Sequence, residues 1–352
     1  MNILTKEQSR TLTILKGIAI ILVIMIHSDI RGYLGVAKYS TIDIYYETIN
    51  RIIVYNAVPL FYFISGFLFF LKEESILIKW KKRLKTIVLP YIIWCFIGFL
   101  IPFFFQVILG LDNLYQGGEL KHIHDFEQID YLRAFWDLRS GNPILSTLWF
   151  LRNLIILIAV SPIIYLLSVK SKYIFPISIL ILYIFDPIPH PYVTWGDIFY
   201  FSIGCWLSIN YKNRGLEILE KMNVPTVVVC WIISLFGSIV AYRYGWNYII
   251  VRNVFFLIDC LFMYAVVNML LSKYNLNFLM KVSKASFFIY LFHEPWLGYF
   301  HGVIFKYWQP GGGSIYVLSW FSCAFAVCYS YAIYKLLNKH FPRFLNFITG
   351  SR

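Results

Sequence analysis

The sequence consists largely of apolar runs of about 20 residues, separated by short charged segments. An α-helix of that length crosses the hydrocarbon core of a bilayer. The alternating segments of about ten residues that form outer-membrane barrels are absent. The sequence therefore predicts an all-α polytopic bundle. We expect ten membrane-spanning helices, at residues 12–30, 52–71, 86–106, 145–168, 173–188, 194–211, 224–242, 249–271, 286–305 and 315–337.

The composition supports an integral membrane protein. Of the 352 residues, 59% are hydrophobic and only 14% are charged, whereas soluble domains have about 25% charged residues. The mean hydropathy is +0.67. No repeat and no attached soluble domain is visible, so we expect a single membrane domain over residues 1–352.

The formal net charge of +13 would suggest a nucleic-acid partner in a soluble protein. Here the Lys and Arg residues are concentrated in alternate segments between the apolar runs, as the positive-inside rule requires. We therefore expect lipid and no nucleic acid as a partner, and cytoplasmic N- and C-termini. The predicted location is the cell (inner or plasma) membrane. The first apolar run is too long for a cleavable signal peptide.

The six cysteines are single residues in apolar runs, without metal or redox spacing. We interpret them as packing residues and expect no metal site.

The first predicted span carries two ionisable residues, Lys16 and His27. They are eleven residues apart, which is just over three helical turns, so both lie on one helix face. Such a face is costly unless it meets protein or water, so we expect it to line a polar groove. The alternative is that Lys16 reaches the inner interface and His27 is a hydrogen-bonded core histidine.

Other predicted spans contain Arg152, Asp259, His293 and Glu294, the last followed by Pro295, which predicts a kink. One interpretation is structural, with Asp259 or Glu294 forming a buried ion pair with Arg152. The other is a reaction chamber with a histidine, a carboxylate that orients it and a cation that holds an anionic substrate. Arg152 and Asp259 are then candidate substrate-binding residues.

A basic cluster follows the second span, with five cations in residues 79–85. Its role is either to anchor the inner end of a helical hairpin on anionic lipid or to bind a phosphate-rich ligand.

The longest outer segment, residues 107–143, is acidic. We expect either a solvated loop or a short interfacial helix at residues 126–138.

Several segments, taken in order and at their spacings, resemble the membrane-bound acyltransferase-3 family. They are the first span with Lys16, Gly17 and His27, the VPLFYFISGF run at 58–67, the basic run into Leu89-Pro90-Tyr91, the LWFL run at 148–151 and the SFFIYLFHEP run at 286–295. The resemblance covers essentially the whole chain, and ten spans is the family's usual number.

The resemblance implies an O-acyltransferase that moves an acyl group, usually acetyl, from cytoplasmic acyl-CoA to a hydroxyl of an envelope glycan or lipid-linked sugar. Acetyl-CoA is then a co-substrate, and no cofactor is bound permanently. The family's catalytic histidine corresponds to His27, and its basic donor-binding residues correspond to Lys16, Lys82 and Lys85, with Arg83 between the last two. Lysine replaces the commoner arginine at these positions and lacks its bidentate fork.

A sugar hydroxyl is a poor nucleophile and needs a base within hydrogen-bond reach. We assign that role, or that of a transient acyl carrier, to His27. We assign His293 and Glu294 as supporting catalytic residues, although they point about 100° apart on a helix and cannot both face the groove squarely. The alternative functions are a permease or flippase for glycans and a membrane assembly partner with a degenerate site. Paired halves, which are typical of transporters, are not visible.

Overall fold

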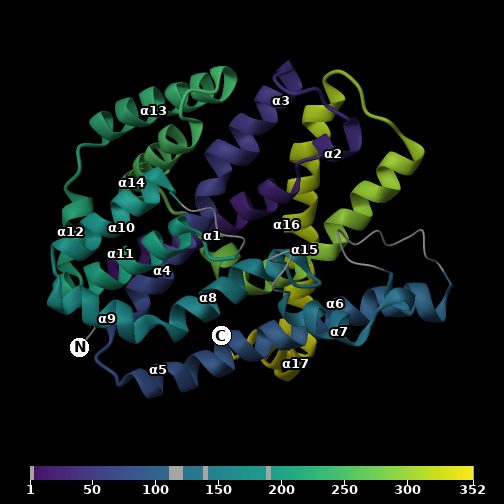
Figure 1. Cartoon of the computed structure of the whole chain (residues 1–352), viewed down its shortest axis with the longest axis horizontal. Coiled ribbons are helices and arrows are strands. Elements are labelled where there is room, and N and C mark those ends of the chain that lie inside the picture. The colour runs from purple at the N-terminus through teal and green to yellow at the C-terminus, as the bar shows by residue number, and fades with distance from the viewer. Residues whose placement is uncertain (1–3, 111–121, 138–141, 188–191, 352) are drawn as a thin grey trace.

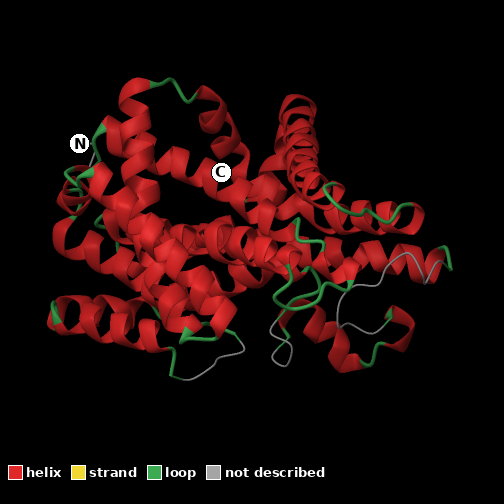
Figure 2. Ribbon diagram, turned by 90° about the horizontal axis from the view of Figure 1, so that it is seen from above, coloured by secondary structure: helices red, strands yellow, loops and turns green. Residues whose placement is uncertain are grey.

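The computed structural model describes residues 4–110, 122–137, 142–187 and 192–351. Within these ranges the chain forms helices and no strand (Figure 2). The predicted all-α class is therefore confirmed.

The helices are labelled in Figure 1. The α-helices are α1 (Lys6–His27), α2 (Arg31–Leu34), α3 (Thr41–Tyr46), α4 (Ala57–Leu71), α5 (Ile76–Arg83), α6 (Leu89–Phe103), α7 (Gln128–Trp136), α8 (Trp149–Ala159), α9 (Ser161–Lys170), α10 (Ile174–Phe185), α11 (Trp195–Tyr211), α12 (Arg214–Glu220), α13 (Val224–Tyr244), α14 (Tyr248–Lys273), α15 (Asn277–Tyr307), α16 (Ser314–His340) and α17 (Pro342–Thr349). The π-helical segments are η1 (Glu47–Ile53), η3 (Leu84–Val88) and η4 (Phe104–Ile108), and the 3-10 turns are η2 (Val54–Asn56), η6 (Ile123–Asp125) and η7 (Ser146–Leu148).

Six helical segments in the described ranges are long and apolar enough to cross a membrane, so the chain is a multi-pass membrane protein. They are Lys6–Leu34, Thr41–Leu71, Ile76–Ile108, Val224–Tyr244, Tyr248–Lys273 and Ser314–His340. The pair α8 and α9, bent by 55°, is a seventh if the two form one span.

The predicted number of ten spans is not confirmed by this measure. Two of the expected spans are short helices, since α10 has 12 residues and α11 has 17. A third, α15, is 31 residues long but carries His293 and Glu294 in its middle. The number of ten remains a prediction.

Both ends of the chain lie in the lower part of Figure 1, as do α5 and α17. The turn between α13 and α14 and the connection from α15 to α16 lie in the upper part. The predicted orientation requires both termini on one side of the membrane, and this arrangement is compatible with it. Which side is cytoplasmic remains a prediction.

The helix α15 breaks where the sequence predicts a kink. Glu294 has non-helical dihedral angles, with φ −100° and ψ 142°. The residue before a proline is disfavoured in the α region, and Pro295 follows. The Tyr329 hydroxyl of α16 donates to the His293 carbonyl oxygen at 2.6 Å, so α16 satisfies a backbone group beside the break.

For the acidic segment at residues 107–143 we expected either a solvated loop or a short helix, and the structure contains the helix. This helix, α7, lies within residues 126–138, and the Tyr91 hydroxyl of α6 donates to the Phe135 carbonyl oxygen. This hydrogen bond joins α7 to α6.

The helices α1 and α15 approach each other closely at Gly17. A Cβ atom on Gly17 would lie 2.5 Å from the Leu279 carbonyl oxygen and 3.3 Å from the Ser283 Cβ. Only glycine permits this backbone separation, and the contact places the Lys16 end of α1 against α15.

We predict that Gly17→Ala lowers the thermal unfolding midpoint in detergent, because the added methyl group must separate α1 from α15. The control is Gly237→Ala in α13, where the nearest atom, Val251 Cγ1, is 3.8 Å from the added Cβ. Both changes gain up to ~1 kcal/mol of helix propensity, so Gly237→Ala should be neutral or stabilising. If the two variants had equal thermal unfolding midpoints, the close contact of α1 with α15 at Gly17 would be contradicted.

Candidate functional site

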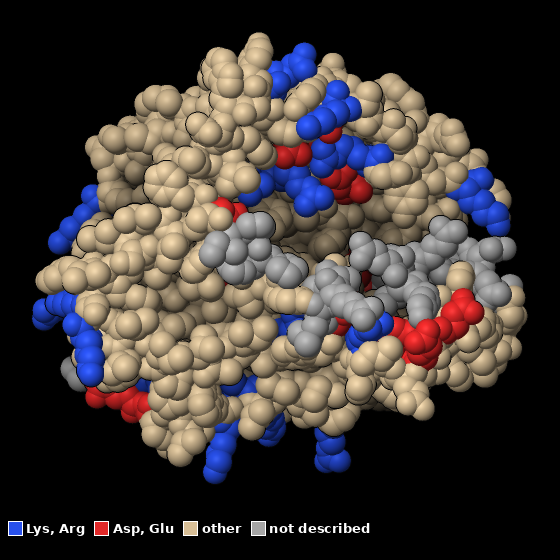
Figure 3. Space-filling model, viewed as in Figure 1, with Lys and Arg blue, Asp and Glu red and all other residues tan. Residues whose placement is uncertain are grey.

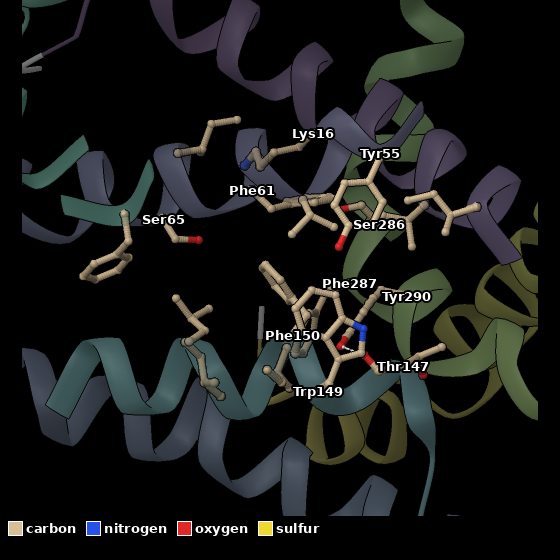
Figure 4. A pocket seen from close by; sticks show the side chains of 18 of the residues that line it. Lys16, Tyr55, Phe61, Ser65, Thr147, Trp149, Phe150, Ser286, Phe287 and Tyr290 are labelled. Atoms are coloured by element: carbon tan, nitrogen blue, oxygen red, sulfur yellow. Dashed lines mark hydrogen bonds between the residues drawn. The ribbon is translucent and has the colours of Figure 1, made fainter. Parts of the chain in front are cut away.

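A cavity of about 910 Å³ lies among α1, α4, α8 and α15. Its middle is aromatic, and Figure 4 shows Tyr55 and Phe61 on one side and Trp149 and Phe150 on the other. Tyr290 of α15 also borders it, and its hydroxyl donates to the Thr147 carbonyl oxygen at 2.6 Å. A cavity of this size suits an extended organic ligand.

Three of the cationic residues that line the cavity come from three different helices: Lys16 of α1, Arg83 of α5 and Lys284 of α15. Lys16 and Lys284 are brought together by the contact of Gly17 with Ser283. The guanidinium of Arg83 lies 5.8 Å from the centre of the Phe69 ring. The sequence analysis included Lys16 and Arg83 among the expected donor-binding residues, but it did not single out Lys284.

His27 ends α1 and also lines the cavity. Its ring centre is 5.3 Å from that of His293, with the ring planes tilted by 53°. The two candidate histidines, which are far apart in sequence, are therefore neighbours.

His293 is fully buried and is oriented by the backbone of its own helix. Its Nδ1 lies 2.9 Å from the Tyr290 carbonyl oxygen and 3.1 Å from that of Ile289. Carbonyl oxygens only accept, so Nδ1 carries the proton and Nε2 is an acceptor. This Nε2 is buried and has no hydrogen-bond partner in the described part of the chain.

The end of α1 is fixed by neighbouring segments. The Asn50 side chain of η1 donates to the Met25 carbonyl oxygen. The Ser319 hydroxyl of α16 donates to the Ser28 carbonyl oxygen at 2.9 Å. These bonds satisfy carbonyl groups that a helix end leaves free, and they hold the backbone on both sides of His27.

Beyond His27, the cavity is bordered by Asp29, Arg31 and Arg51. Arg31 makes ion pairs with Asp29 at 2.7 Å, Asp43 at 2.9 Å and Glu47 at 3.4 Å. The Tyr242 hydroxyl also donates to Asp43, at 2.7 Å. Acidic and basic side chains gather beside a hollow in the face that Figure 3 shows. The polar residues at 27, 28, 29 and 31, directly after the apolar run, were an available sequence signal for this group.

The other lysines of the basic cluster do not line the cavity. Lys82 is 58% exposed at its side chain and pairs with Glu74 at 2.6 Å. This hydrogen bond lowers the pKa of the Glu74 carboxyl, which lies outside the candidate spans. Lys85 is exposed as well. Within the cluster, Arg83 is thus the residue that faces the cavity, and donor-binding roles for Lys82 and Lys85 remain predictions.

The structure separates Arg152 from Asp259. Arg152 is buried and donates to the Asn153 side chain at 2.8 and 3.1 Å. Asp259 of α14 accepts a hydrogen bond from the Trp231 indole of α13 at 2.7 Å. In the described ranges, neither Asp259 nor Glu294 pairs with Arg152, so the buried ion pair of the structural interpretation is not formed. Neither Arg152, Asp259 nor Glu294 borders the cavity, and their roles at a site remain predictions.

The acyltransferase domain of the acyltransferase-3 family matches residues 10–335, from α1 into α16. The chain belongs to the acyltransferase-3 family. All cavity residues named above lie in the matched region. The protein is therefore a membrane-bound acyltransferase.

A named relative is the succinoglycan biosynthesis protein ExoH of Rhizobium meliloti (strain 1021). It is 24% identical over 305 residues, which cover 84% of this chain and 79% of the relative. No solved structure matches the chain.

We predict that Arg31→Ala destabilises the protein by ~3 kcal/mol, because three carboxylates then face one another without their shared cation. Thermal unfolding in detergent measures the loss. The control is Arg243→Ala, which removes an exposed arginine that lies over the Tyr39 ring. If the two variants unfold at the same temperature, the ion cluster does not stabilise the fold.

Proposed function

We propose that the protein is an O-acyltransferase of the cell (inner or plasma) membrane that moves an acetyl group from cytoplasmic acetyl-CoA to a hydroxyl of an envelope polysaccharide. The observation that supports this most is that one cavity contains both the group of three cations and His27. The family membership supports acyl transfer. The name of the relative ExoH supports a polysaccharide as the acceptor.

The donor would bind with its phosphates at the cations. Phosphate oxygens form strong charge-assisted hydrogen bonds with Arg and Lys. The eleven residues from Lys16 to His27 correspond to ~16 Å of helix, which is of the order of a pantetheine arm. The thioester would then reach His27. Lys82 and Lys85, which lie outside the cavity, would attract the negatively charged donor and increase its association rate.

The acceptor hydroxyl would attack the thioester carbonyl carbon beside His27. As the new C–O bond forms and the C–S bond breaks, the imidazole takes the hydroxyl proton and returns it to the CoA thiolate. A covalent route through acyl-His27 has the same overall balance, and both routes are open. The second imidazole, His293, adjoins His27 and supports its orientation.

The donor site makes a specific prediction about the cations. Arg83→Ala and Lys284→Ala should each weaken CoA binding by ~10-fold, since each removes a charge-assisted hydrogen bond worth ~1.5 kcal/mol. The double variant Lys82→Ala/Lys85→Ala should have a smaller effect that disappears at high salt. Calorimetry of CoA binding in detergent measures all three.

The control is Lys212→Ala, because Lys212 is exposed and pairs with Glu73. Wild-type affinity in the Arg83 variant would exclude the cavity as the donor site. Unchanged affinity in the Lys82/Lys85 variant would leave those lysines with a topological role only.

The chemistry makes a prediction about His27. His27→Ala should reduce acetyl transfer by at least ~10²-fold and leave CoA binding nearly intact, because it removes the base without touching the cations. His27→Gln, which keeps polarity and approximate size, should be equally inactive. CoA release from acetyl-CoA, measured with envelope glycan fractions as acceptors, reports the activity.

Near-normal turnover of His27→Gln would transfer the catalytic assignment to His293 with Glu294. Absence of CoA release by the wild-type protein with every glycan fraction would favour a glycan permease or an assembly partner.

A further inference from the structure

We propose that Gly350, which ends α17, is a positioning residue that holds Arg83 and Thr86 in place at the donor end of the cavity. The inference rests on the proposed function, since it assumes that this end binds CoA. It concerns an element beyond residues 10–335, to which the family match assigns nothing.

Gly350 lies against the backbone at the end of the basic cluster. Its φ is +74°, a left-handed conformation that side chains rarely adopt. A Cβ atom here would lie 2.6 Å from the Lys85 carbonyl oxygen, 2.7 Å from Thr86 Cα and 3.0 Å from Pro90 Cγ. These neighbours are two backbone atoms and a proline ring, so a side chain at 350 would displace the chain at Lys85 and Thr86.

The displaced segment would be the wall of the cavity. Lys85 and Thr86 belong to η3, in which the Leu89 N–H bonds to the Leu84 carbonyl oxygen. Arg83, Thr86 and Ile87 line the cavity. A π-helical turn is a local departure from the α-helix and often occurs at functional sites. The segment η3 thus lines the donor end, and Gly350 lies against its backbone at Lys85 and Thr86.

The helix α17 is itself fixed to the bundle. The Trp94 indole of α6 donates to the Ile348 carbonyl oxygen at 3.0 Å. The side chains of Leu345 and Ile348 are buried, while Phe344 and Phe347 are exposed on the opposite side. The contact of Gly350 with η3 is therefore made by a helix that α6 holds in place.

The test compares Gly350→Ala with Gly245→Ala. Gly245 ends α13 with φ +73° and has nothing within 4 Å of an added Cβ, so it carries the same backbone cost without the contact. Gly350→Ala should weaken CoA binding and raise the KM for acetyl-CoA by ~10-fold or more, because a shift of about 1 Å in a binding group costs up to 10²-fold. The KM for the acceptor should not change. Gly245→Ala should match the wild-type protein in CoA binding and in both KM values.

A second variant tests the same support without altering Gly350. Trp94→Phe removes the hydrogen bond to Ile348 and should raise the donor KM in the same direction. The inference would be overturned if Gly350→Ala and Trp94→Phe both bound CoA as tightly as Gly245→Ala does. Failure of the wild-type protein to bind CoA would instead refute the proposed donor site.

Discussion

The close contact of α1 with α15 is the constraint on which the rest of the site depends. Gly17 allows the two backbones to approach, and Lys16, Ser283 and Lys284, which are next to or part of this contact, all line the same cavity. At the other end of α1, the same pair of helices brings His27 to His293. The distance between the cations and the imidazoles is therefore set by one helix with a fixed rise per residue, rather than by mobile loops.

The ionisable groups of the bundle fall into two kinds. Some are bound by neighbouring side chains: Arg31 forms ion pairs with three carboxylates, and Asp259 accepts a hydrogen bond from the Trp231 indole. The carboxylates offset the cost of burying the Arg31 charge, and both sets of contacts join separate segments of the chain. Others face the cavity, as do Arg83 and His27, or adjoin it with an unsatisfied atom, as does His293 Nε2. Ionisable groups on a membrane helix are costly unless they meet protein, water or a ligand, so their position around one cavity supports a ligand there.

The length of the apolar runs was enough to predict the helical class, and the helical repeat predicted the shared face of Lys16 and His27. Proline chemistry predicted the break at Glu294. The choice among the basic residues at 79–85 could not be made from sequence, because α5 passes into the π-helical turn η3 and the helical periodicity changes there. Lys284 looked like one of several topological charges, and it became a site residue only through the contact at Gly17. Arg31 lies just beyond the expected span at residues 12–30, so a search for ionisable residues within apolar runs does not include it.

The two ends of the cavity differ in the ligands they suit. Among its described lining residues, the donor end contributes Lys16, Arg83 and Lys284 and no carboxylate, whereas the other end contributes Asp29 together with Arg31 and Arg51. A uniformly cationic end favours a ligand with several negative charges. A mixed end offers both donors and acceptors, which is what the hydroxyls of a sugar require. In the proposed reaction, this asymmetry would distinguish the two substrates, with the CoA phosphates at one end, the glycan at the other and His27 between them.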